Sequence, residues 1–249
     1  MKLSVTRINT FLEDPRKYWY IYEMGIQTPK SEGYYFGSAV HEGLDYYYSG
    51  KDPMQGVSQS LFGKKASIAE EAKEGVDPYK LYTQARKIFD IYKKEAPKFK
   101  PLFVEHMFEI DLIHPVTKED IGVTFTGKID LITVDAQMVD HKTGSGSDNG
   151  YFEEANWVQS TGYAYYYWRK FGKLPNSFIY NLIIKGNSKN PPRFEQKPLY
   201  PDIKDLCRFI EMCKDVSGKI SRGETKDYPS EKHHRVCPCK DICPYCQQT

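Results

Sequence analysis

Over the first hundred residues, hydrophobic positions repeat mostly at the spacing of an α-helix. Ser4 is placed to cap a helix in which Ile8, Phe11 and Leu12 recur at intervals of three and four. The helices predicted here run from Ser4 to Pro15, from Pro15 to Tyr22, from Phe36 to Tyr48 and from Tyr79 to Ala96. Residues 51–77 are mixed and polar and predict no regular element. This part of the chain is therefore expected to be mainly helical.

After Pro101 the pattern changes to the alternation of β-strands. Three strands joined by short turns predict an antiparallel meander, and a long aromatic helix ended by Gly172 follows it. The predicted strands are Phe103–Ile113, Ile121–Val134, Met138–Lys142, Ser177–Lys185 and Arg193–Leu199, and the predicted helices are Phe152–Phe171 and Pro201–Ser221. The order indicates an α/β or α+β fold.

Length and charge narrow the class of protein. The chain has 249 residues, 35 Lys and Arg against 33 Asp and Glu, and a formal net charge of +2, which makes coating of nucleic acid by bulk charge implausible. A local basic groove remains open. No apolar run approaches the roughly 18 residues that span a bilayer, and Met1 to Asn9 lack a secretory h-region. We therefore expect a cytoplasmic protein that does not act in a membrane.

The candidate chemistry lies on two neighbouring predicted strands. Asp130 ends the sequence Gly127-Lys128-Ile129-Asp130, and a short turn leads to Asp140-His141-Lys142. Hairpin pairing can bring the two carboxylates side by side, and Asp140 and Lys142 leave the same strand face because they are two residues apart. Paired carboxylates beside a cation suit Mg²⁺ or Mn²⁺, which can polarise a phosphodiester and activate water.

A plainer interpretation of these residues is a solvent-side Asp–Lys pair with Asp130 in a turn. It is the better explanation of the short D-x-K pattern taken alone. The apolar neighbours Ile129, Leu131 and Val139 argue against it, because they indicate that the carboxylates are partly buried. Buried charges must be paired or must bind metal.

Four segments in order resemble the PD-(D/E)xK nucleases, in the RecB-like branch that includes CRISPR-associated adaptation nucleases and phage exonucleases. The matching patterns are Gly37-x-x-x-His41, Gly127-x-x-Asp130, Asp140-x-Lys142-Thr143-Gly144 and Gln159-x-x-x-Tyr163. The opening segment from Ser4 to Tyr22 also resembles that of the family, so the likeness spans nearly the whole chain. It implies a restriction-endonuclease-like central mixed sheet flanked by helices.

The resemblance also implies roles for individual residues. By it, His41, Asp130 and Asp140 are metal ligands, the His141 carbonyl is another ligand, and Lys142 is catalytic. Each has a plainer alternative, such as a core histidine at His41.

Other residues are open to two interpretations. Gln159 and Tyr163 share a helix face and are either nucleic-acid contacts or a structural pair. Glu105 could add a ligand, but a solvated strand carboxylate is the better interpretation of its position. The neighbouring tyrosines of residues 163–168 could stack bases, but consecutive aromatics point around a helix, so most are expected in the core.

The carboxyl-terminal end carries four thiols within ten residues, at Cys237, Cys239, Cys243 and Cys246. Either Zn²⁺ or a [4Fe–4S] cluster would satisfy four thiolates. Many relatives in the family bind such a cluster with one amino-terminal Cys before a Pro and three carboxyl-terminal Cys. Here Asp14 precedes Pro15, so a self-contained tail site is the simplest option unless Cys207 or Cys213 substitutes.

The sequence thus predicts one nuclease domain over residues 1–249, in which a helical part (1–100) precedes a sheet core (101–200) and a helix with the Cys-rich tail (201–249). The expected activity is that of a Mg²⁺- or Mn²⁺-dependent exonuclease on DNA ends or single strands, in recombination, repair or phage DNA metabolism. The alternative is a catalytically silent DNA-binding subunit with the same fold. No G-x-x-x-x-G-K-[ST] motif occurs. Unwinding would therefore need a partner such as a separate helicase, inside a bacterial or phage-infected cell.

Overall fold

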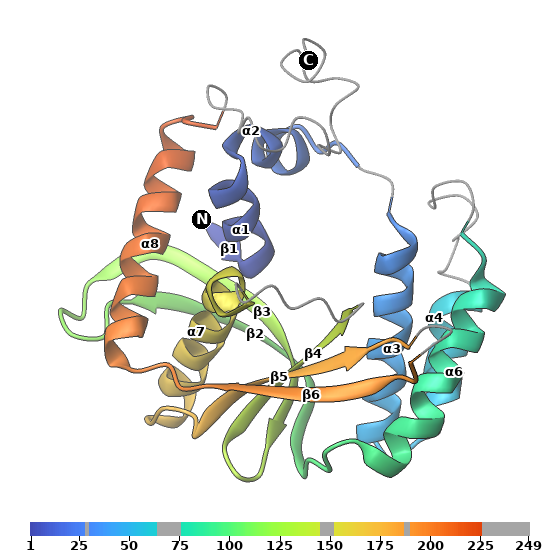
Figure 1. The fold of residues 1–249 in the computed structure, drawn as a ribbon. Helices are drawn as coiled ribbons and strands as arrows, with labels where there is room; N and C mark the ends of the chain where they lie inside the picture. The colour runs from blue at the N-terminus through green and yellow to red at the C-terminus, as the bar shows by residue number, and fades with distance from the viewer. Residues whose placement is uncertain (28–29, 64–75, 145–151, 187–189, 226–249) are drawn as a thin grey trace.

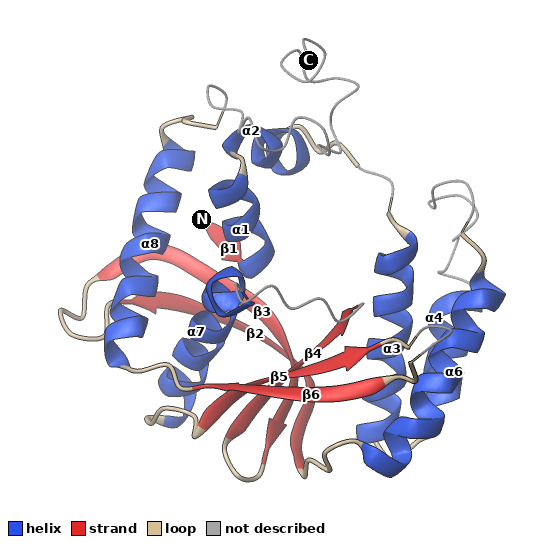
Figure 2. Ribbon diagram, viewed as in Figure 1, coloured by secondary structure: helices blue, strands red, loops and turns tan. Residues whose placement is uncertain are grey.

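The computed structural model describes residues 1–27, 30–63, 76–144, 152–186 and 190–225. Within these ranges six strands form one mixed sheet with helices packed on both faces (Figures 1 and 2). The strands are β1 (Lys2–Ser4), β2 (Pro101–Ile113), β3 (Asp120–Thr133), β4 (Gln137–Gly144), β5 (Ser177–Ile184) and β6 (Arg193–Leu199). The helices are α1 (Val5–Glu13), α2 (Pro15–Tyr18), the π-helical η1 (Trp19–Glu23), α3 (Glu32–Tyr48), α4 (Pro53–Phe62), α6 (Pro78–Glu95), α7 (Phe152–Phe171) and α8 (Ile203–Ser221).

The strand order explains how distant segments meet at one place. The order is β1-β3-β4-β5-β6, with β2 paired along the other side of β3. Strands β2, β3 and β4 form the predicted antiparallel meander, whereas β4 and β5 run parallel and are connected through α7. A parallel pair needs such a crossover, because the chain must return to the starting edge. The prediction of an α/β fold with a mixed central sheet is confirmed.

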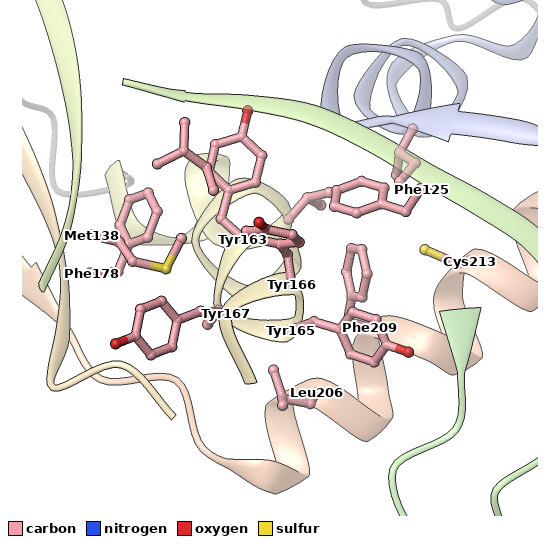
Figure 3. Packing of buried hydrophobic residues seen from close by; sticks show 14 of the residues in the cluster. Phe125, Met138, Tyr163, Tyr165, Tyr166, Tyr167, Phe178, Leu206, Phe209 and Cys213 are labelled. Atoms are coloured by element: carbon pink, nitrogen blue, oxygen red, sulfur yellow. The ribbon is translucent and has the colours of Figure 1, made fainter. Parts of the chain in front are cut away.

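One face of the sheet is covered by α1, α7 and α8. All four tyrosines of α7 are buried there, because the helix packs against both the sheet and α8 (Figure 3). A Cβ atom at Gly162 would lie 2.8 Å from the Phe125 ring and 2.9 Å from the Phe209 ring, so the glycine allows this close packing. The expectation that most of these aromatics belong to the core is confirmed.

The opposite face is covered by α3, α4 and α6, which pack together as a second core (Figure 1). Two glycines allow α3 to pack closely against its neighbours, namely Gly43 in α3 itself and Gly56 in α4. A Cβ at Gly43 would lie 2.5 Å from the Phe89 ring, and one at Gly56 would lie 2.4 Å from the Glu42 carbonyl oxygen. This packing fixes the position of α3, which carries His41.

Two elements were not expected from the hydrophobic pattern. Residues 51–77 do contain a helix, α4, which starts at Pro53 with the Asp52 side chain accepting a hydrogen bond from the Met54 amide at 3.3 Å. The short strand β1 joins the sheet edge before the Ser4-capped helix begins. Both are short, and their tertiary partners rather than local pattern stabilise them. No helix among the described residues has the length and apolar character needed to cross a bilayer.

Candidate active site

Helix α3 presents His41 to strand β3 from the second face of the sheet. One turn earlier, a Cβ at Gly37 would lie 3.2 Å from the Thr143 hydroxyl oxygen, so the helix passes close to the end of β4. His41 Nδ1 lies 3.4 Å from Asp130 Oδ2. The histidine therefore meets the acidic strand end that the sequence indicated, although the two residues are far apart in the chain.

The strand alternation breaks where β2 and β3 carry their acidic residues. Ile129 and Ile132 both pack into the core beneath α7, although a regular strand would place residues three apart on opposite faces. Glu105 lies between the pairs Val104↔Leu131 and His106↔Ile129, and has a φ of +51°. A left-handed backbone is uncommon for glutamate and is found at functional sites more often than elsewhere.

This break gathers three side chains with metal-ligating atoms. His41, Glu105 and Asp130 each offer one ligand atom, and these atoms all lie within 4.8 Å of one another. Glu105 also forms an ion pair with Lys128, and its side chain is only 19% exposed. The interpretation of Glu105 as a solvated strand carboxylate is therefore wrong, because the bent backbone turns it toward His41 and Asp130.

Asp140 and Lys142 form a second group beside the first. The Lys142 ammonium lies 2.8 Å from Asp140 Oδ2, which confirms that the two side chains share a strand face. Gln159 of α7 donates a hydrogen bond of 2.6 Å to Asp140 Oδ1. Asp140 is buried and does not belong to the three-residue group of His41, Glu105 and Asp130.

The backbone of His141 links the two groups. Its amide donates a hydrogen bond of 2.7 Å to Asp130 Oδ2, the same oxygen that faces His41. Consecutive residues of β4 thus contact both groups. The Asp140 side chain pairs with Lys142, and the His141 amide orients Asp130. Burial lowers the pKa of the His141 imidazole to about 4, so this ring is neutral.

The charges of His41 and Asp130 stabilise each other. Burial alone would lower the pKa of His41, but the Asp130 carboxylate outweighs it and raises that pKa to about 9. Burial would likewise raise the pKa of Asp130, but the His41 imidazolium holds it well below its usual range. Without metal the pair is therefore an imidazolium beside a carboxylate, and a cation binding to His41 would have to displace its proton.

For Asp140, in contrast to Asp130, the effect of burial on the pKa outweighs that of the neighbouring cation. Burial raises its pKa to about 6, the Lys142 ammonium counteracts part of that rise, and the neighbouring Asp130 charge adds to it. A carboxylate with a raised pKa beside another carboxylate is a recurrent feature of functional sites. A nearby divalent cation would favour the ionised form of both groups.

Two cavities flank the site and share Lys128. The first, of about 490 Å³, has His41, Glu105 and Glu42 in its wall together with the first turns of α3. The second, of about 650 Å³, lies between the start of α1 and strands β2 and β3, with Gly127 and Tyr163 in its wall. Both volumes are in the range of roughly 300–1,000 Å³ that is typical of ligand sites.

A family resemblance extends over nearly the whole chain. The sequence profile of the PD-(D/E)XK nuclease superfamily matches residues 2–244. The chain belongs to the PD-(D/E)XK nuclease superfamily. Its six-stranded mixed sheet with helices on both faces agrees with the restriction-endonuclease-like fold. No curated protein sequence matches the chain.

A solved structure supports the same fold. A crystal structure of a protein from Eubacterium rectale, provisionally described as an exonuclease, aligns with a TM-score of 0.65 at 14% identity, over 100% of this chain and 88% of its own. The crystal structure of SSO0001 aligns over 96% of both chains, but its TM-score of 0.39 at 11% identity is too low to support an argument.

Within this PD-(D/E)XK chain, the two residues predicted to contact nucleic acid are held by the protein itself. The Gln159 amide binds Asp140 and also lies 3.4 Å from the Tyr180 hydroxyl. The Tyr163 hydroxyl donates a hydrogen bond of 3.0 Å to the Lys128 carbonyl oxygen, and the residue is 6% exposed. The structure thus places Gln159 behind Asp140 and Tyr163 behind Lys128, at the wall of the second cavity.

The predicted metal site of the tail lies outside the described residues, since Cys237, Cys239, Cys243 and Cys246 all follow residue 225. At the amino-terminal position where the family resemblance leads us to expect Cys, Asp14 accepts hydrogen bonds from the Arg16 and Lys17 amides at 2.9 and 3.1 Å. Asp14 therefore caps α2. Cys213 is buried in the core and burial raises its thiol pKa, which does not suit a metal ligand.

Two residues near the site were missed at the sequence level. Lys128 stands inside the Gly127-x-x-Asp130 pattern, which gives it no role of its own, although it pairs with Glu105 and lines both cavities. Asn181 is fully buried in β5 and contacts the His141 ring. A single amide side chain in the apolar run Ser177–Ile184 is the signal that could have singled it out.

Proposed function

We propose that this chain is a Mg²⁺- or Mn²⁺-dependent deoxyribonuclease that hydrolyses phosphodiesters as an exonuclease on DNA ends or single strands. The observation that carries the proposal is the convergence of His41, Glu105 and Asp130 within 4.8 Å, next to the Asp140–Lys142 ion pair. The exonuclease description of the Eubacterium rectale protein favours the same activity. Recombination, repair or phage DNA metabolism would be its setting.

The donor set fits a divalent cation. Two carboxylates and one imidazole offer hard oxygens and one nitrogen at a spacing that a single ion can bridge. We propose His41, Glu105 and Asp130 as ligands, with Asp140 and the His141 carbonyl completing the shell from β4. When bound, the cation would polarise the phosphodiester and lower the pKa of a bound water.

The neighbouring side chains have separate tasks in this proposal. Lys142 would offset the negative charge that develops on the phosphate oxygens in the transition state, or hold the attacking water. Asp140 keeps the ammonium in place through the 2.8 Å ion pair, and Gln159 keeps Asp140 in place through the 2.6 Å hydrogen bond. Gln159 would thus be a positioning residue rather than a contact to nucleic acid.

The two cavities provide room for a polynucleotide on both sides of the scissile phosphate. Lys128 lines both, so a strand crossing the site would pass its ammonium. The complete set of charged groups argues against a silent DNA-binding subunit, because a site without catalysis does not need Lys142 beside a metal centre.

A gel assay with 5′- and 3′-labelled single- and double-stranded DNA tests the proposal. We expect shortening of the labelled strands with Mn²⁺ or Mg²⁺ and none with EDTA, because the phosphodiester is stable without an activated water. A ladder that starts at one end identifies the exonuclease and its polarity. Intact DNA with both metals, from protein whose folding is verified by circular dichroism, would contradict the proposal.

A further inference from the structure

A buried polar network lies against strand β4, on the face covered by α3 and α6, the same face from which α3 presents His41. Asn181 of β5 is directly beside His141 in the parallel ladder and is fully buried. Its amide nitrogen lies 2.9 Å from His141 Nδ1 and donates a hydrogen bond of 3.2 Å to the Tyr92 hydroxyl. The Tyr92 and Tyr48 hydroxyls lie 2.8 Å apart. The network is thus continuous from α3 and α6 to β4.

The network fixes the orientation of the His141 ring. The ring stacks on Tyr48 with centroids 5.7 Å apart and an interplanar angle of 10°. Its Nε2 is buried without a hydrogen-bond partner among the described residues, so Asn181 supplies the ring's polar contact there. The Asn181 amide group donates to both Tyr92 and His141, so both of its N–H hydrogens are used.

The backbone amide of the same residue meets the candidate metal centre. Strands β3 and β4 pair at Leu131↔Val139 and Ile132↔Met138, and the His141 amide meets Asp130 beyond these pairs. The hydrogen bond to Asp130 therefore depends on where β4 holds residue 141. The ring, which contacts Tyr48 and Asn181, anchors that point of β4.

We propose that Asn181 is a positioning residue for the metal centre. It acts through the His141 ring, with Tyr92 and Tyr48 as its support. In this way it fixes the position of the His141 amide, which orients Asp130 toward His41. This inference rests on the proposed metal site of the nuclease. It does not require that the substrate be DNA, because the affinity for metal alone reports on it.

The test measures the binding of Mn²⁺ by isothermal titration calorimetry and by the spectrum of the bound ion in electron paramagnetic resonance. Asn181→Leu keeps the size of the side chain and removes the amide. We expect it to weaken Mn²⁺ binding roughly 10- to 100-fold, as is typical of residues that support metal ligands. The control Ile210→Ala removes contacts of a fully buried residue of α8 on the other face, and should lower the melting temperature without changing Mn²⁺ affinity.

A double-mutant cycle identifies the route of the effect. His141→Phe keeps an aromatic ring for Tyr48 but removes Nδ1, so adding Asn181→Leu to it should cost little further Mn²⁺ affinity. Full additivity of the two losses would overturn the inference, as would a Kd for Asn181→Leu within twofold of the parent protein. If Asn181→Leu does not fold, Tyr92→Phe should weaken binding roughly two- to tenfold, the effect of one hydrogen bond, and an unchanged Kd would overturn the inference.

The outcomes separate this inference from the proposed function. A parent protein that binds Mn²⁺ but cleaves no nucleic acid contradicts the nuclease function and leaves the role of Asn181 standing. If the protein is a nuclease but Asn181→Leu leaves its Mn²⁺ affinity unchanged, only the proposed role of Asn181 is contradicted. A parent protein that binds no Mn²⁺ contradicts both.

Discussion

Lys142→Ala is expected to lower the rate of DNA cleavage by at least about 10²-fold, the usual effect of removing one preorganised group that stabilises transition-state charge. The ammonium of Lys142 lies 2.8 Å from Asp140 and 5.7 Å from the centre of the Tyr180 ring, so its position is fixed by the protein. The side chain is partly exposed at 36%, and little packing is lost with it. Single-turnover cleavage of end-labelled DNA with saturating Mn²⁺ measures the change.

The matched control is Lys173→Ala, which removes one positive charge from an exposed loop position after α7. It should cleave DNA at the parent rate, and both variants should bind DNA nearly as the parent does. A Lys142→Ala protein that cleaves within threefold of the parent would contradict the catalytic role of this lysine. An equal loss in the control would show that net charge, and not position, is responsible.

Gly56→Ala is expected to destabilise the protein by roughly 1–3 kcal/mol, although alanine normally favours a helix interior over glycine. The added Cβ would lie 2.4 Å from the carbonyl oxygen and 2.8 Å from the carbonyl carbon of Glu42. Backbone atoms cannot rotate aside as a side chain can, so α3 and α4 must separate. Urea unfolding followed by circular dichroism measures the free energy of unfolding.

The control for Gly56→Ala is Gly33→Ala in the first turn of α3, where the added Cβ would meet only the Ser31 hydroxyl at 3.7 Å. This substitution should be neutral or slightly stabilising. A Gly56→Ala protein as stable as Gly33→Ala would contradict the close packing of α3 on α4. Because Glu42 follows His41, a shift of α3 should also weaken Mn²⁺ binding.

The sequence was sufficient to predict the meander, the long aromatic helix and the pairing of Asp140 with Lys142. Each of these follows from a local pattern, such as alternation along a strand or a spacing of two residues. The contact of His41 with Asp130 did not follow from local pattern. It came from the likeness of ordered motifs to a family, because no spacing relates residues that meet only through packing of α3 on the sheet.

The sequence was insufficient where the backbone departs from regular geometry. Glu105 was misjudged because strand alternation cannot foresee a left-handed residue, and that one residue turns the carboxylate toward Asp130. Helix α4 was missed because its sequence is mixed, and Asp52 and Pro53 carried signals too short to decide. The role of Asn181 depends on its neighbour across a parallel ladder, which no single strand reveals.

The central claim is that one divalent cation binds among His41, Glu105 and Asp130. Crystals grown with Mn²⁺ and measured near the manganese absorption edge test it most directly. We predict an anomalous peak within coordination distance of His41 Nδ1 and of carboxylate oxygens of Glu105 and Asp130, and its loss in Asp130→Asn. A peak elsewhere in the molecule, or none beside His41 at saturating Mn²⁺, would contradict the account.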